Sequence, residues 1–280
     1  VLLLNTLEIL DWRVWWTILS LWPILLIAAG LDLLIGRRSI WGSLLVVVLV
    51  FAIAGGVLWL SANNVVEGAA GEPVSQSLGD ATEAVVSLDP GVGILSIKAL
   101  PESANLVEGT VQADSDGELV TDFSASGGKA TFELKGIGGP WIPFFSGLDA
   151  RREWNLGLTP GAALDLETSL GLGEARLDLT GLQLSTLDTD MGIGLTTVTL
   201  PAEARYQATI SGAIGETTVL IPRGLGVRIH VDTGLATRQM PEGYRQDGDT
   251  YTSPGYETAE NQVNLDVEQA IGLLKIRYAD

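Results

Sequence analysis

The 280-residue sequence has no cysteine, a single histidine and few basic residues. Without cysteine the chain can form neither a disulfide nor a thiolate metal site, and it has no thiol nucleophile. Lys and Arg together number 16 against 34 Asp and Glu, which gives a formal net charge of −18 at pH 7. A balance this acidic argues against binding to nucleic acid, because phosphates would be repelled, and against a domain lying flat on anionic lipid.

Patterns that carry catalysis are equally scarce. The single histidine, His230, lies between Ile229 and Val231, so alternation places it on the outer face of a strand. Residues 114–118 (DSDGE) begin like a calcium loop but lack the later glutamate of that motif, and an Asp-Gly turn is the simpler interpretation. A carbohydrate-active enzyme would need paired acidic groups along one sheet, and the sequence shows no such set. It therefore predicts no enzyme, no cofactor and no metal site.

The first 60 residues differ in composition from the rest. They hold six of the eight Trp residues and two long apolar runs, at about 14–35 and 40–60. About 20 helical residues cover the ~30 Å hydrocarbon core of a bilayer, so residues 1–60 are predicted to form a transmembrane helical hairpin. Arg37 and Arg38, in the short loop between the runs, place that loop in the cytoplasm. The rest of the chain is then expected on the extracytoplasmic side of a bacterial cell membrane.

Two further expectations concern this region. Residues 1–10 begin with Val1 and not with Met, and they are interpreted as the tail of an earlier span. Small residues inside the runs would let the helices approach another membrane protein closely. The candidates for helix packing are Gly30, Ser43, Gly55 and Gly56. The expected partners are therefore the lipid bilayer and a second membrane protein.

Residues 61–83 are small and polar and are interpreted as a linker, and residues 84–280 are dominated by an internal repeat. Its clearest copies are centred on Gly173, Gly194 and Gly215, which are 21 residues apart. Apolar or Thr residues recur seven and five positions before each glycine and four and six positions after it. The same template fits copies centred on Gly93, Gly128, Gly272 and, in part, Ala236.

Spacing of two on each side of a central glycine predicts a strand, a sharp reversal and a second strand. A two-stranded unit cannot bury its apolar face alone, so successive units are expected to stack. The predicted fold class is an N-terminal transmembrane helical hairpin followed by an all-β domain, a β-solenoid with rungs of about 21 residues. An antiparallel β-sandwich is the alternative, because it also has short strands and regular turns.

Two segments interrupt the repeat. Residues 136–153 contain an aromatic cluster, and residues 241–262 contain three Tyr residues among turn formers. The aromatic cluster is either a contact loop, for a partner or for the outer leaflet of the membrane, or a cap that closes one end of the stack. Its candidate contact residues are Trp141, Ile142, Phe144 and Phe145.

The apolar segment 22–38 resembles the membrane region of LiaF-like proteins, which belong to the bacterial response to cell-wall-active antibiotics. Residues 249–256, 263–267 and 272–276 resemble the β-domain of these proteins, known as the toast-rack domain. The resemblance implies a non-enzymatic envelope protein that regulates a stress response through protein–protein contacts, and some members restrain a sensor kinase. Similar β-domains occur in proteins labelled as adhesins. The alternative is therefore a structural or adhesive protein that self-assembles, or an accessory subunit of a larger membrane assembly.

Overall fold

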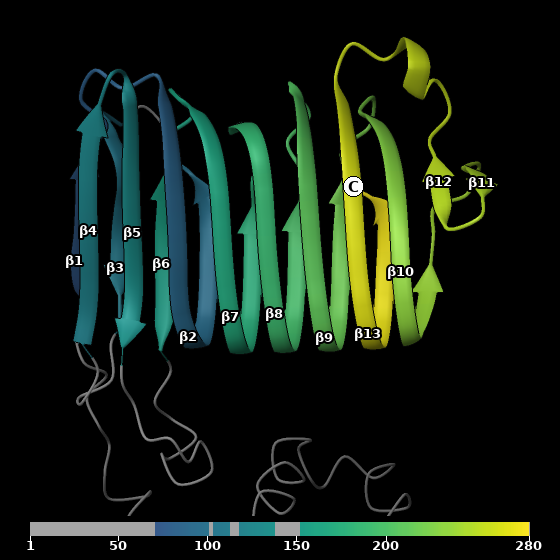
Figure 1. Ribbon diagram of the computed structural model, residues 1–280, viewed down its shortest axis with the longest axis horizontal. Helices are drawn as coiled ribbons and strands as arrows, with labels where there is room; N and C mark the ends of the chain where they lie inside the picture. Colours follow the sequence, from purple (N-terminus) through teal and green to yellow (C-terminus); the bar gives the residue numbers. More distant parts are fainter. Residues whose placement is uncertain (1–70, 101–102, 113–117, 138–151, 280) are drawn as a thin grey trace, which may run out of the picture. The chain divides into compact units, whose positions relative to one another are not determined.

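The computed structural model describes residues 71–100, 103–112, 118–137 and 152–279, which belong to one compact unit (Figure 1). Apart from the short 3-10 helix η2 (Tyr256–Thr258), the elements of this unit are strands. They are β1 (Glu72–Ser77), β2 (Glu83–Ala99), β3 (Asn105–Val111), β4 (Glu118–Ser126), β5 (Lys129–Ile137), β6 (Glu153–Leu158), β7 (Ala163–Asp178), β8 (Gln183–Thr199), β9 (Arg205–Ile221), β10 (Gly226–Gln239), β11 (Arg245–Asp247), β12 (Thr250–Thr252) and β13 (Gln262–Tyr278).

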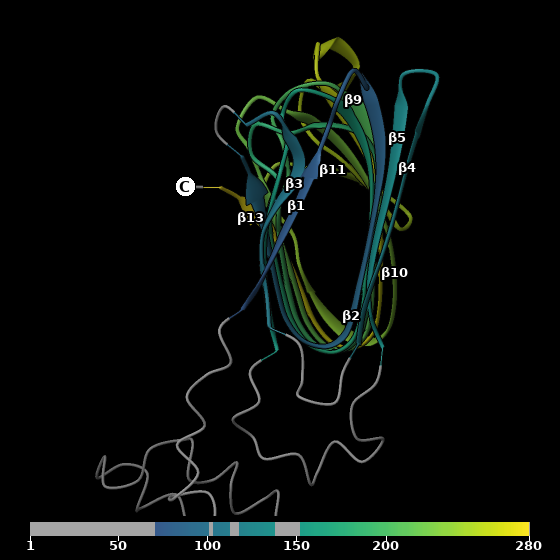
Figure 2. The same ribbon diagram turned by 90° about the vertical axis from the view of Figure 1, so that its left-hand side faces the viewer.

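Six of these strands are long, and each bends near its middle (Figure 2). We call β2, β7, β8, β9, β13 and β10 rungs, the part of a rung before its central residue the first arm, and the part after it the second arm. The first arms form one layer and the second arms form the other. Buried and exposed residues alternate along both arms. In β8, for example, Leu187, Thr189 and Met191 are buried and Asp188 and Asp190 are exposed. The inward residues of the two layers therefore make a single aliphatic core between them.

Glycine is required at the bend. The central glycines of five rungs have φ between 129° and 151°, a backbone conformation that residues with a side chain rarely adopt. Neighbouring bends also stack directly on one another. A Cβ added to Gly194 would lie 1.9 Å from the carbonyl oxygen of Gly173, and one added to Gly215 would lie 1.8 Å from that of Gly194. The reversal predicted between two strands is thus a bend inside one continuous strand.

The rungs pair in parallel and in the register that the repeat predicts. Gly173 lies opposite Gly194, and Gly194 lies opposite Gly215. Equivalent residues consequently form columns that run across the sheet, such as Leu177, Val198 and Val219. The antiparallel sandwich considered as an alternative does not describe these rungs.

The spatial order of the last rungs differs from their order in the chain. The sheet runs β9-β13-β10, so the C-terminal strand lies between two earlier ones. After β10 the chain forms β11 and β12, and β12 pairs antiparallel with the outer edge of β10. The chain then returns through η2 and places β13 beside β9, with Gly272 opposite Gly215. The hairpin of β11 and β12 therefore covers part of the first-arm edge of β10, at Arg228–His230.

Half-length strands form the other end of the sheet. β5 pairs with the first arm of β2, and β6 pairs with its second arm. β4 and β5 form an antiparallel hairpin, in which Gly127 and Gly128 make the turn with φ of 60° and 83°. The copy of the repeat centred on Gly128 is therefore wrong as a rung, because two adjacent glycines form a tight hairpin turn here and not a bend.

The predicted fold class also needs correction, because it included an N-terminal helical hairpin. The described residues are all-β apart from η2, and no helix among them is long and apolar enough to cross a membrane. The length of an apolar run gives the thickness of bilayer that it could cross as a helix, but it does not by itself establish that the run is helical. The tail 1–10, the spans 14–35 and 40–60, and the candidate packing residues Gly30, Ser43, Gly55 and Gly56 lie outside the described residues. β1 falls within the range interpreted as a linker, 61–83, so the β-domain is already present by residue 72.

Candidate interaction surfaces

Because every rung contributes one residue to each column, a side chain type that recurs at one position becomes a continuous stripe on the surface. The outward face of the layer formed by the first arms is the most strongly charged surface of this kind. Its outward positions on β7, β8, β13 and β10 hold seven carboxylates, which we call the acidic face: Asp165, Glu167, Asp188, Asp190, Asp266, Glu268 and Asp232.

The parallel register brings these carboxylates close to one another. Glu167 lies opposite Asp188. Burial raises the pKa of Asp188 above its ordinary value of 3.8, and the negative charge of Asp190 raises it further. Asp165 forms an ion pair with Lys129, in which Oδ2 lies 3.4 Å from Nζ. Within the described chain, no salt bridge joins the other six carboxylates of the acidic face to a cation. The acidic face therefore offers negative charge that internal pairs leave largely uncompensated.

The outward face of the layer formed by the second arms has a different chemistry. Threonine is common there, as at Thr197 and Thr199 of β8, and the acidic residues close to the bend have partners. Glu174 Oε1 lies 2.6 Å from Arg176 Nε, and Lys275 Nζ lies 2.7 Å from Glu216 Oε1. This face is close to neutral, so the outer faces of the two layers differ in charge: one is acidic and the other is not.

The bends of the rungs form an edge with a third kind of surface, aliphatic and exposed. The residue directly before the central residue of each rung is Val, Leu or Ile, and all six are exposed to solvent. We call this column the bend stripe: Val92, Leu172, Ile193, Ile214, Ile271 and Leu235. The repeat template used only inward-facing positions, so sequence reasoning missed this column, although an aliphatic residue precedes the centre of each of the six rungs.

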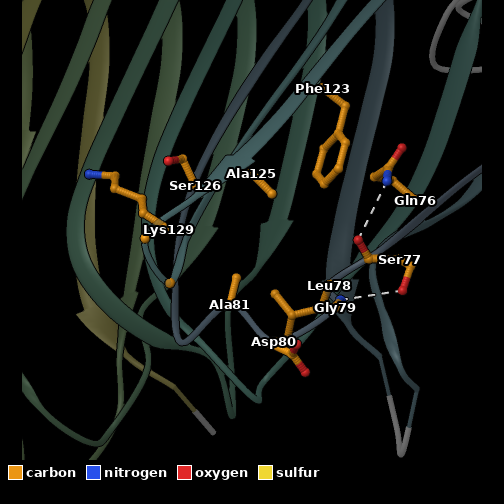
Figure 3. Close-up of a pocket in the computed structure, with 12 residues that line it drawn as sticks. Gln76, Ser77, Leu78, Gly79, Asp80, Ala81, Phe123, Ala125, Ser126 and Lys129 are labelled. Atoms are coloured by element: carbon orange, nitrogen blue, oxygen red, sulfur yellow. Dashed lines mark hydrogen bonds between the residues drawn. The ribbon is translucent and has the colours of Figure 1, made fainter.

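A pocket of about 370 Å³ opens at the end of the sheet where the half-length strands lie, between residues 76–81 and the turn of the β4–β5 hairpin (Figure 3). Figure 3 shows Phe123 on the side of Gln76 and Ser77, and Lys129 on the opposite side. Its only charged lining residues are Asp80 and Lys129, and Lys129 is paired with Asp165. No group of three or more His, Asp or Glu in the described chain is placed to hold a metal ion. The pocket therefore offers shape but little acid–base chemistry.

The sequence-predicted site residues have mixed outcomes. His230 is exposed on the outside of β10, opposite Thr250 and Asp266, as alternation predicts. The candidate contact residues Trp141, Ile142, Phe144 and Phe145 lie outside the described residues, and so do residues 114–117 of the turn-like acidic segment. Their roles remain predictions.

Comparisons with known proteins agree with this architecture. Residues 165–276 match the family described as cell wall-active antibiotics response LiaF, C-terminal. A solved structure from Clostridium sporogenes, described as a "putative cell adhesion protein", has the same fold with a TM-score of 0.68 and 23% sequence identity, over 74% of this chain and 98% of that one. Among curated proteins none matches. Residues 65–220, more than half of the chain, match the N-terminal domain of toast_rack, DUF2154, and the chain therefore belongs to the toast-rack family.

Proposed function

We propose that this chain is a non-catalytic regulator of the bacterial envelope stress response, of the LiaF-like type, and that it acts by binding another protein with its acidic face. The match to the LiaF family supports the class of function. The acidic face is the observation that supports the mode of action. Its carboxylates are held in register by a rigid ladder, and internal ion pairs neutralise few of them.

The partner that fits this face carries a cationic surface. Charged columns on both proteins would steer their encounter and fix their relative orientation, while contributing less to affinity than to specificity. A membrane sensor kinase is the partner class that the resemblance implies, and a basic extracytoplasmic segment of such a kinase would meet the requirement.

Charge reversal tests this function. In the full chain, Glu167→Lys combined with Asp266→Lys should abolish co-purification with the partner after cross-linking in cells, and should alter a transcriptional reporter of cell-wall stress. The matched control is Asp178→Lys combined with Glu203→Lys, which changes the net charge equally at exposed positions away from the acidic face. An equal effect of both pairs, or of neither, would refute a role for the acidic face.

Self-association is the second candidate function, and two observations favour it. The fold is shared with a protein described as a putative cell adhesion protein. In addition, β4 pairs on one side with β5 and has no other strand partner in the described sheet, so it leaves an edge that could pair with another copy.

The mass of the full chain in mild detergent, measured by light scattering, separates the two candidates. A defined homo-oligomer in the absence of any partner would support the structural role. Trp141→Ser combined with Phe144→Ser and Phe145→Ser should then dissociate it if the aromatic segment is the contact. An assembly that persists in this variant would exclude that segment and point to the strand edges.

A further inference from the structure

The bend stripe is an ordered column of aliphatic side chains on the outside of the domain. Register pairing joins its members in sequence: Val92 lies opposite Leu172, Leu172 opposite Ile193, and Ile193 opposite Ile214. Ile271 and Leu235 continue the column. With a strand spacing of about 4.8 Å, five steps between six rungs give a stripe about 24 Å long.

Exposed aliphatic residues are concentrated at this edge. Nine large hydrophobic residues are exposed in the described chain, and seven of them adjoin the centre of a rung: the six of the bend stripe and Leu195. Leu235 has a relative accessibility of 83%. Large apolar side chains exposed as a contiguous patch usually mark a surface that another phase or molecule covers.

Most of the backbone at this edge is paired between neighbouring rungs. The ladder continues through the bends, so that residues on both sides of the turn are paired, as Ile193 is with Ile214 and Leu195 is with Glu216. An apolar environment penalises every unpaired N–H and C=O group. A folded-over ladder differs in this respect from an open strand edge, because it leaves fewer backbone groups that must bond to water.

The charged groups close to the stripe are also compatible with an apolar environment, because they are either paired or lie some distance away. On the second-arm side, Glu174 and Glu216 are each neutralised by a cation within 2.7 Å. On the first-arm side, the residues adjoining the stripe are Gly or Ala, as at Gly192 and Ala213. The acidic face starts three residues before the stripe, at Asp190 and its equivalents, which is about 10 Å along an extended strand.

We propose that the bend stripe inserts into the interface of a lipid bilayer and holds the toast-rack domain upright on the membrane. A stable protein–protein interface needs about 20–30 residues a side with aromatic or Arg anchors at its centre. The stripe is one residue wide and contains neither, so a second copy or another protein is a poorer occupant. A shallow aliphatic ridge suits the boundary between headgroups and acyl chains.

The places where other segments of the chain join the described domain agree with this orientation. β1 starts at Glu72 opposite Val111, and β6 starts at Glu153 opposite Ile94, directly after the bend of β2. β4 starts at Glu118, opposite the last residue of β5, Ile137. Three segments, 1–70, 113–117 and 138–151, thus join the domain at its bend edge, and the first of them contains the two longest apolar runs of the sequence.

The absence of cysteine allows a direct test in the full chain. Single variants Ile193→Cys and Ile214→Cys are labelled with an environment-sensitive fluorophore and reconstituted with phosphatidylcholine vesicles. The control is Ala202→Cys, an exposed residue in the loop between β8 and β9, at the opposite edge. Nitroxide lipid should quench the two stripe probes at least about threefold more than the control, because such a ridge lies about 5–10 Å into the interface.

Aqueous iodide provides the complementary measurement. Stripe probes that iodide quenches as strongly as the control would overturn the proposal, because they would be in water. Shielding of the probes from both quenchers would also overturn it, because protein and not lipid would then cover the stripe. Neither readout involves a sensor kinase or a reporter, so the inference can fail while the proposed function stands.

A second variant guards against local effects of the label. Ile193→Ser, Ile214→Ser and Ile271→Ser are combined, with Leu235→Cys carrying the fluorophore. All three replaced side chains are exposed, so the thermal midpoint should be unchanged. Quenching of the Leu235→Cys probe by nitroxide lipid should fall several-fold relative to the same probe in the parent chain. Undiminished quenching would contradict insertion of the stripe.

Discussion

The first and second arms of the rungs have the same interior and different exteriors. Both alternate aliphatic side chains into one core, because inward positions are fixed by packing against equivalent residues of the neighbouring rungs. Their outward positions are free of that constraint, and one layer has become acidic while the other is neutral and rich in threonine. A repeat that stacks in register thus converts a choice at one position into a property of a whole face, which is where function is expected to differ between members of such a fold.

The largest expected effect tests the bend that joins the two arms. Gly194→Ala should destabilise the protein by about 3 kcal/mol or more, because it combines a strained φ with a severe clash. The φ of Gly194 is 151°, and the added Cβ would lie 1.9 Å from the oxygen of Gly173. Chemical denaturation measures the change.

Gly181→Ala is the control for this change. Gly181 also has a positive φ, of 80°, but an added Cβ would meet nothing within 4 Å. We expect a loss of only about 1 kcal/mol from backbone strain there. If the two substitutions cost the same, the stacking of bends is not what demands glycine.

The next effect compares buried hydroxyl groups in the two arms. In the first arms, the Oγ1 atoms of Thr168 and Thr189 are hydrogen-bonded at 3.1 Å. Thr168→Val leaves the buried hydroxyl of Thr189 without its partner and should cost about 1–3 kcal/mol. In the second arm of β8, the Oγ1 atom of Thr196 is buried and has no partner. Thr196→Val should therefore be neutral or stabilising by thermal denaturation, and a loss equal to that of Thr168→Val would break the distinction.

Much of this architecture follows from the sequence, because each repeat of about 21 residues has the same backbone and packing requirements at its bend. Gly173, Gly194 and Gly215 stack at their predicted register since each needs the same φ and the same close approach. The position of β13 could not be read in the same way. All rungs have similar residues at equivalent positions, so the sequence shows that any two rungs could pair but does not show which of them are neighbours in the sheet.

Two local elements show other limits of pattern reasoning. Alternation around Gly128 fits a bend and a hairpin equally well, and only the adjacent Gly127 distinguishes the tight turn that forms. β1 (EPVSQS) is an edge strand with one partner and few apolar residues, so it has no alternation to reveal it. Sequence reasoning found no acidic set along one sheet and overlooked the bend stripe, because outward residues form columns only once the rungs are known to stack in parallel.

A smaller effect concerns the ion pairs of the second-arm face. Lys275→Gln removes the partner of Glu216, whose side chain is 36% exposed. Pairs at the surface contribute about 0.2–1 kcal/mol, so the thermal midpoint should fall only slightly, and less at high salt. A large loss that salt does not reduce would show that this pair supports the bend and does not merely balance charge.

The smallest effect concerns the acidic face itself. Burial, with a lesser contribution from Asp190, raises the pKa of Asp188 in the folded protein above its ordinary value of 3.8, so the native state binds the proton more tightly than the unfolded state. The stabilisation linked to this group is then fully present below pH 3.8 and is lost as the pH rises through the raised pKa. Asp188→Asn should consequently unfold at a slightly higher temperature than the parent at pH 7, with the advantage disappearing near pH 3. Asp190→Asn should lower the pKa of Asp188 in carboxylate NMR titration without restoring the ordinary value, because burial is the larger cause. If Asp188→Asn is no more stable at pH 7, these carboxylates do not strain the first-arm face, and their accumulation there would have no cost for a binding partner to relieve.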